Sequence, residues 1–107
     1  MSRAVELASP ETKRLAALEN ANHVRRWRAE LKRQIARREQ DVAHILLDPP
    51  TEAHTMTVAE LLGSQRGWGR VRTLKALQSV PVSEHKQLWR LTDRQVRALL
   101  GTLRSRA

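Results

Sequence analysis

The strongest constraint on the fold is the stretch of residues 11–48, which contains neither glycine nor proline. It is rich in Ala, Leu, Arg, Glu and Gln, which favour helices, and its β-branched residues are scattered singly. Residues 9–11, Ser-Pro-Glu, signal the start of a helix. The serine can cap the first N–H groups, the proline has a φ suited to the first turn, and the glutamate suits the positive end of the helix dipole. The sequence therefore predicts one long helix over about 11–40 and a shorter one over 41–47, which ends at a double proline.

The second half of the chain is divided by short helix signals. Thr57 with Glu60, and Thr92 with Gln95, match capping boxes, in which two side chains satisfy each other's backbone N–H groups. Glycines and prolines between these signals mark the connections. Because the chain also has no Phe and no Tyr, we predict an all-α fold. The expected elements are helices over 57–62, 70–79 and 92–103 and a single helical turn over 84–88.

A chain of 107 residues fits one domain with a modest core. We expect a leading helical region over 11–47 and a bundle of short helices over 57–103, with residues 1–9 and 104–107 flexible. The absence of cysteine excludes disulfides, thiolate metal sites and cysteine nucleophiles. The four histidines lack metal-ligand spacing, so we predict no enzyme activity, no metal and no cofactor.

The charge balance indicates the class of partner. The chain has 20 Lys and Arg against 11 Asp and Glu, a formal net charge of 20 − 11 = +9. Such a field favours a polyanion, with nucleic acid first and an acidic membrane surface second. No apolar run approaches the roughly 20 residues of a membrane span, and residues 1–10 lack the apolar stretch of a secretory signal. We therefore expect a cytoplasmic protein without a membrane partner.

One concentration of positive charge lies on the long helix. Residues 25–38 carry seven cations and one anion, a net of +6. A helical wheel places one apolar stripe toward the core, formed by Ala17, Val24, Trp27, Leu31, Ile35, Val42 and Ile45. The basic residues avoid this stripe, and a row rich in arginine suits bidentate phosphate contacts; the candidates are Arg25, Arg26, Arg33 and Arg37. The alternative is an ordinary solvated helix face.

The second concentration lies in residues 66–106, with ten cations against two anions, a net of +8. It contains the motif Arg-Gly-Trp-Gly-Arg-Val-Arg between two expected helices. The glycines permit positive φ and close approach, while the tryptophan plugs between the helices. Backbone N–H groups of the turn and of the next helix then face outward and can hold a phosphate. The candidate residues are Arg66, Gly67, Trp68, Gly69, Arg70, Arg72 and Lys75. The alternative is an ordinary turn between helices with Trp68 in the core.

The remaining two tryptophans are assigned to packing. Trp27 and Trp89 fall on apolar stripes and are expected in the core. Stacking on a nucleobase is the alternative for either ring.

The order of these features resembles the actinobacterial type of integration host factor, a nucleoid-associated protein. The likeness covers most of the chain and rests on segments 15–45, 58–62, 67–72 and 91–99, including Ala-Ala-Leu-Glu at 16–19 and Ala-Glu-Leu-Lys at 29–32. It implies a helix-two-turns-helix fold in which Gly67 and Gly69 form a phosphate-gripping turn. The cations beside that turn would be Arg70, Arg72 and Lys75. It also implies sequence-tolerant binding of duplex DNA, chromosome or plasmid organisation, and assistance to phage site-specific integration.

Two residues depart from the family pattern. Arg66 stands where a proline usually precedes the first glycine, and it would either loosen the turn or add a phosphate contact. Pro81 stands where a glycine usually closes the next helix, which affects the geometry after Val80. The second half also resembles an RNA-binding small-subunit ribosomal protein of the same fold type. That protein, however, places its glycine turn close to its N-terminus and carries a long basic tail. A basic helical adaptor for an acidic protein is the other alternative.

The sequence therefore predicts a long N-terminal helix followed by a compact helix-two-turns-helix bundle, together forming one DNA-binding domain over residues 1–107. We expect a monomeric, nucleoid-associated protein that binds double-stranded DNA mainly through the phosphate backbone with little sequence specificity. The long helix and the glycine turn would each contact one backbone stretch, which bends or bridges the duplex. A phage integrase is the protein partner that the resemblance implies.

Overall fold

A computed structural model describes residues 9–105 of the chain. These residues form five α-helices and two short 3-10 helices and contain no strand, as the sequence predicted. In chain order the elements are α2 (Pro10–Ala36), α3 (Val42–Leu47), η1 (Thr51–Ala53), α4 (Val58–Leu62), α5 (Arg70–Gln78), η2 (Leu88–Arg90) and α6 (Asp93–Ser105). The expected flexibility of residues 1–8 and 106–107 lies outside the described residues. Ser9 and Arg104, by contrast, belong to ordered helix ends, because Ser9 caps α2 and Arg104 lies within α6.

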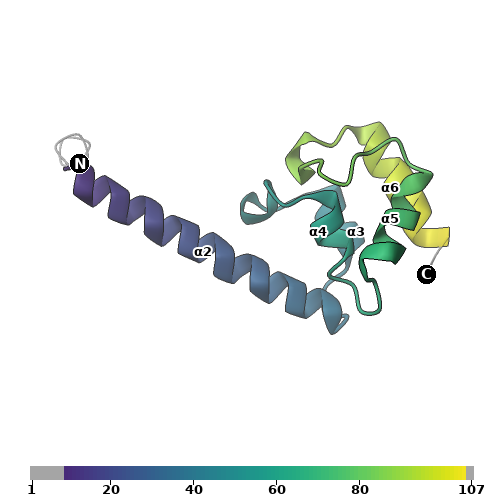
Figure 1. Ribbon diagram of the computed structural model, residues 1–107, viewed down its shortest axis with the longest axis horizontal. Coiled ribbons are helices and arrows are strands. Elements are labelled where there is room, and N and C mark those ends of the chain that lie inside the picture. Colours follow the sequence, from purple (N-terminus) through teal and green to yellow (C-terminus); the bar gives the residue numbers. More distant parts are fainter. Residues whose placement is uncertain (1–8, 106–107) are drawn as a thin grey trace.

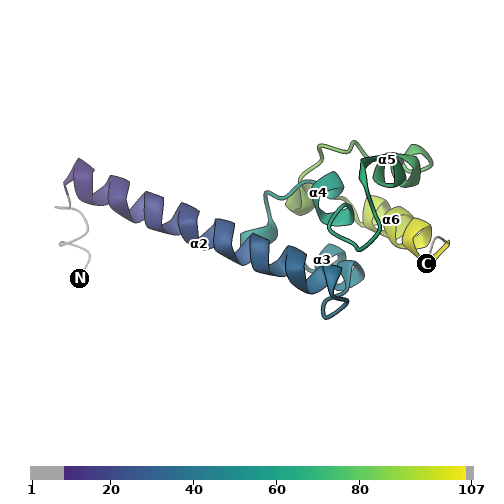
Figure 2. The ribbon, with the colours of Figure 1, turned by 60° about the horizontal axis from the view of Figure 1, so that its bottom comes forward.

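Helix α2 projects from the bundle of short helices like an arm (Figures 1 and 2). The radius of gyration is accordingly 16.9 Å, against about 13 Å for a compact chain of this length. Only the C-terminal part of α2 packs, through buried Leu31 and Ile35 and partly buried Trp27. Ala17 is exposed, so the expected core stripe is wrong at its N-terminal end. The physical reason is that, among the other elements of residues 9–105, none lies along the first half of the helix.

The long helix ends at Ala36, four residues before the predicted end. The backbone N–H of Arg38 donates to Ile35 O at 3.0 Å, and that of Glu39 donates to Gln34 O at 2.8 Å. This pair of bonds is a Schellman motif, which requires a left-handed residue at its centre. Arg38 takes that conformation with φ 63°, in the place where a glycine would have signalled the helix end in the sequence.

The core lies between the end of α2 and the short helices. Its centre is formed by residues that are almost inaccessible to solvent, namely Leu46, Met56, Val58, Leu61, Leu62, Ala76, Leu88 and Leu99. Each of the six short helices contributes at least one buried side chain, with Ala53 from η1, which is why these helices hold together. Trp89 is not among them. Its side chain is exposed (52% of the residue), so the expectation that it lies in the core is wrong.

The segment 54–59 pairs with the segment 84–89 through backbone hydrogen bonds. Leu88 N donates to Met56 O at 2.9 Å, and Val58 N donates to Lys86 O at 2.9 Å. These bonds replace the helical turn predicted over 84–88, which is wrong. The chain instead makes a turn at Glu84–His85 and an isolated bridge at Gln87 before it enters η2.

The two capping boxes differ in how far they form. At α6 the box is complete, because Gln95 N donates to Thr92 Oγ1 and Thr92 N donates to Gln95 Oε1, both at 3.1 Å. At α4 only half of it forms: Glu60 N donates to Thr57 Oγ1 at 3.1 Å, but the Glu60 carboxylate accepts from Lys32 Nζ at 2.7 Å. The ion pair with α2 therefore outcompetes the predicted return bond to the cap.

Pro81 is accommodated without disturbing the core. Helix α5 ends at Gln78, and Val80 and Val82 are both buried on either side of the exposed proline. Val82 N donates to Val80 O at 2.8 Å, and Gln95 Nε2 donates to Pro81 O at 3.2 Å. The segment after Val80 is thus tied to the start of α6.

Candidate nucleic-acid interface

The glycine motif forms a tight turn between α4 and α5. Trp68 N donates to Gln65 O at 3.0 Å, and Gly67 has φ 81°. A four-residue turn with positive φ at its third position is the arrangement of a type II turn, which favours proline at its second position and glycine at its third. Arg66 fills the second position, and the turn closes without the proline that the family usually has there.

The two glycines serve different purposes. Gly67 supplies the positive φ, as predicted, whereas Gly69 has φ −80° and ψ −175°, which any residue can adopt. The expectation of positive φ is therefore wrong for Gly69. A Cβ placed on Gly69 would meet nothing within 4 Å, so the fold itself does not require glycine there. Trp68 between them is only 9% exposed and joins the core, and Arg72 lies over its ring at 4.7 Å.

Helix α5 begins without a side-chain cap. Its N-cap is Gly69, and within residues 9–105 the backbone N–H groups of Gly69, Arg70 and Val71 have no acceptor. The start of α4 is satisfied instead, because Val58 N and Ala59 N donate to carbonyls of the 84–89 segment. An uncapped helix start combines free donors with the positive end of the helix dipole, and this combination suits an anion.

Cations surround this helix start unevenly. Arg66 and Arg70 are exposed beside it, and Arg70, with 75% of its side chain accessible, makes only a 3.5 Å contact to Glu84. Arg72 instead turns onto the Trp68 ring. Lys75 is exposed but lies about 140° around the helix from Arg70, so it does not flank the same donors.

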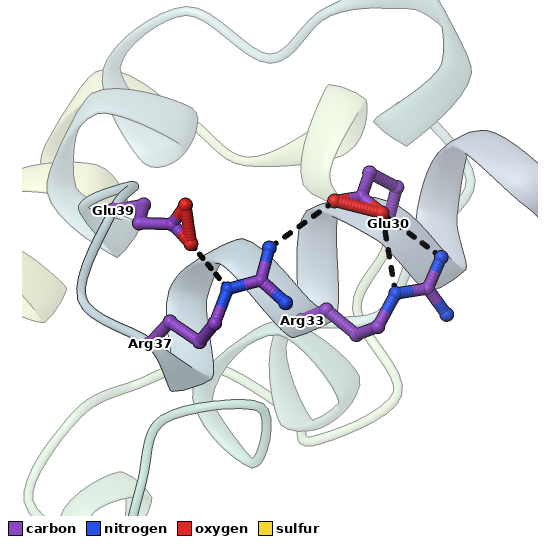
Figure 3. Close-up of polar contacts among 4 residues, drawn as sticks. All are labelled: Glu30, Arg33, Arg37 and Glu39. Atoms are coloured by element: carbon purple, nitrogen blue, oxygen red, sulfur yellow. Dashed lines mark hydrogen bonds and ion pairs between the residues drawn. The ribbon is translucent and has the colours of Figure 1, made fainter.

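The basic row of α2 is more neutralised than the sequence suggested (Figure 3). Glu30 Oε2 accepts from Arg33 at 2.9 Å, and Glu30 Oε1 contacts Arg37 at 3.4 Å. The hydrogen bond from Arg33 lowers the pKa of Glu30 below its ordinary 4.5. Arg37 also pairs with Glu39, whose proximity raises the pKa of the Arg37 guanidinium.

The N-terminal members of that row remain more available. Arg25 donates only to Asn22 Oδ1 at 3.0 Å, and Arg26 forms no ion pair or side-chain hydrogen bond within the described part of the chain. Arg28 points elsewhere, because it donates to Glu52 O at 2.8 Å and to the Thr55 hydroxyl, fixing η1 against α2. In this row Arg25 and Arg26 therefore form no ion pair within residues 9–105, whereas Arg33 and Arg37 are paired with acids.

An open groove of about 930 Å³ connects the glycine turn with the end of α2 and the end of α6. Its charged lining consists of four arginines, Arg38, Arg66, Arg72 and Arg104, and two acids, Glu39 and Asp41. The sequence analysis missed Arg38 and Arg104, which lie far from the motif in the chain. No local pattern could have found them, because tertiary packing alone brings the C-terminal ends of α2 and α6 to the turn.

Known proteins resemble this chain in sequence and in fold. No family model matches the sequence. The chain is 34% identical over 92 residues to the integration host factor of Mycolicibacterium smegmatis (strain ATCC 700084 / mc(2)155), and this match covers 84% of the chain and 88% of that protein. The chain belongs to the integration host factor family. The resemblance inferred from the residues is therefore confirmed.

The fold of this integration host factor family member is shared with a solved structure of sIHF bound to an 8bp palindromic DNA. The TM-score is 0.72 at 26% sequence identity, and the match covers 78% of this chain and 96% of that one. Two findings concern other site types. Within residues 9–105 no helix is long and apolar enough to cross a bilayer, and no group of three His, Asp or Glu side chains is arranged to hold a metal.

Proposed function

We propose that this protein binds double-stranded DNA at the start of α5, mainly through backbone phosphates. The observation that carries the proposal is the uncapped helix start, where the N–H groups of Gly69, Arg70 and Val71 have no acceptor in residues 9–105 and Arg66 and Arg70 lie exposed alongside. Phosphate contacts of this kind position a duplex without reading its bases. The DNA-bound state of the sIHF neighbour supports the same partner.

A second contact surface supports an architectural role. Arg25 and Arg26 are exposed on α2, which projects away from the bundle that carries the glycine turn. A monomer that touches two backbone stretches on separate elements bends a duplex or bridges two of them. We assign the protein to the nucleoid on this basis. Assistance to a phage integrase, which the family resemblance implies, would use the same bent DNA.

The salt dependence of binding to a random-sequence duplex tests the proposal. If four to six phosphates are neutralised, the slope of log affinity against log salt concentration should be about −3.5 to −5.5. Arg70→Ala should weaken every duplex sequence about equally and make this slope less negative by about 1. Arg94→Ala is the matched control, because Arg94 lies away from the start of α5. Its neighbour Gln95 bonds to Pro81, which follows the other end of that helix.

Four outcomes would contradict the proposal. A flat salt response would exclude phosphate binding as the main contact. Preference for double-stranded RNA would favour the ribosomal-type alternative, and loss confined to one DNA sequence would indicate direct base readout. Absence of binding to any nucleic acid would favour the protein-binding adaptor.

A further inference from the structure

The exposed indole of Trp89 is held in a fixed position on the surface. Its Nε1 donates to Gln87 Oε1 at 2.9 Å, and its backbone N–H donates to His54 O at 3.2 Å. The preceding residue, Leu88, is buried and bonded to Met56 O. An exposed tryptophan that is anchored in this way loses little conformational entropy when a ligand binds to it.

One side of this indole carries a cation. The Arg90 guanidinium lies over the Trp89 ring, 4.8 Å from its centroid. Because half of the residue is still accessible, the ring keeps a surface on which a planar group could stack.

A shallow hollow of about 480 Å³ lies next to the side chains that hold the indole. Its lining contains no carboxylate and consists of Ser83, His85, Lys86, Gln87 and Arg90. Gln87 and Arg90 are the same residues that contact the Trp89 ring. The neighbouring acid, Glu84, is directed to Arg70 at 3.5 Å and to His85 at 3.4 Å. A hollow with hydrogen-bond donors and cations beside an accessible aromatic ring suits a phosphate attached to a planar base.

We propose that Trp89 and the hollow beside it bind an unpaired nucleotide of single-stranded DNA, with the base stacked on the indole and its phosphate near Lys86 and Arg90. This site goes beyond the duplex contact, because it uses the Trp89 ring, Lys86 and Arg90, none of which belongs to the proposed duplex surface, although Glu84 contacts both His85 of the hollow and Arg70 at the start of α5. A protein that bends duplex DNA can meet such nucleotides where base pairs open, since sharp bending unstacks base steps.

The test measures binding of a fluorescent thymidine oligonucleotide of about 12 nucleotides by anisotropy. Trp89→Leu keeps an apolar side chain but removes the aromatic face, and it should weaken binding about 5- to 100-fold. Trp89→Phe keeps a stacking face and should restore most of the affinity. Because the side chain is exposed, both variants should keep the wild-type circular dichroism and melting temperature. The oligonucleotide should also quench tryptophan emission in the wild type and less so in Trp89→Phe.

Each contrary result has a definite meaning. Equal affinity of Trp89→Leu and wild type for the oligonucleotide would overturn the proposal. It would also be overturned if Gly69→Asp lost oligonucleotide binding while Trp89→Leu kept it, because the strand would then bind at the glycine turn. If thymidine monophosphate competes as strongly as the unlabelled oligonucleotide, the ligand is a free nucleotide, and the proposal of a single-stranded DNA ligand is overturned. Binding of a hairpin duplex should fall in Gly69→Asp and be unchanged in Trp89→Leu. A failure of the proposed duplex binding can thus be distinguished from a failure of the proposed single-strand site.

Discussion

Replacing Gly69 with aspartate should stabilise the protein and weaken its binding to DNA at the same time. Gly69 is the N-cap of α5, and its φ of −80° and ψ of −175° resemble those of Thr57, which caps α4 at −84° and 158°. A side chain at this position meets no neighbour within 4 Å. Aspartate can therefore adopt the same backbone and accept a hydrogen bond from the N–H of Val71, which has no acceptor within residues 9–105.

The two expected magnitudes follow from the same geometry. A better cap contributes a few tenths of a kcal/mol, the charge at the positive end of the helix dipole about 0.3–1, and reduced freedom of the unfolded chain about 0.4–1. Together these give about 1–2 kcal/mol and a melting temperature higher by several degrees. The same carboxylate occupies the donors meant for the phosphate and repels it, which should cost about 2–4 kcal/mol, or roughly 30- to 1,000-fold in affinity.

The assay pairs thermal unfolding with duplex binding at fixed salt concentration, and Gly69→Asn is the matched control. Asparagine caps the helix equally well but carries no charge, so it should stabilise the protein and cost only about 10-fold in affinity. Unchanged DNA binding in Gly69→Asp would refute the assignment of the α5 start as the phosphate site. A lower melting temperature would refute the capping argument, and equal losses for Asp and Asn would exclude charge repulsion as the cause.

Four further predictions use other residues. Gly67→Ala should destabilise the fold by about 1–2 kcal/mol in urea unfolding, because φ 81° is strained for any residue with a Cβ; unchanged stability would argue against the turn geometry. Arg38→Gly should stabilise it by up to about 1 kcal/mol, since it relieves the left-handed arginine of the Schellman motif, and a loss would show that the Arg38 side chain contributes more than its strain costs. Glu30→Gln should release Arg33, while Arg37 keeps its pair with Glu39, and should make the salt slope of duplex binding more negative by about 1; an unchanged slope would exclude Arg33 from the interface. Hydrogen bonds from its own backbone N–H and from His23 hold the pKa of Glu52 below 4.5, so its stabilising effect is complete above that pH and is lost as pH falls through the folded-state pKa. NMR titration of Glu52 and acid unfolding of Glu52→Gln, which should be less acid-sensitive than wild type, check this.

Much of the fold could be predicted because its signals act over a few residues. The caps of α2, α4 and α6 depend on a side chain that bonds to an N–H three positions later, so Ser9, Thr57 and Thr92 identified the starts of these helices directly, whereas Asp41, which caps α3, was expected inside the helix. The same holds for Gly67, since a tight turn with positive φ favours glycine wherever it occurs.

The errors arose where a local preference met a distant partner. Glu60 was expected to bond back to its own helix start but pairs with Lys32 on α2. The stretch 84–88 was expected to form a helical turn, but its backbone groups pair with residues 56–59. In each case the competing group lies more than twenty residues away, and no pattern within one helix reveals it.

The sequence by itself determined an all-helical chain, the starts of its helices and the glycine turn, because these depend on backbone conformation and on hydrogen bonds between near neighbours. Only the tertiary structure decided which charges remain available and which apolar side chains are covered. It paired Lys32 of α2 with Glu60 of α4, brought Glu84 to Arg70 and placed Trp89 on the surface, whereas the pairs of Arg33 and Arg37 with Glu30 and Glu39 are local to α2 and its C-terminal turn. The physical reason is that burial and ion pairing depend on which elements come together in space. The sequence could therefore propose where the interface lies, but it could not show which distant side chains pair with the charges there.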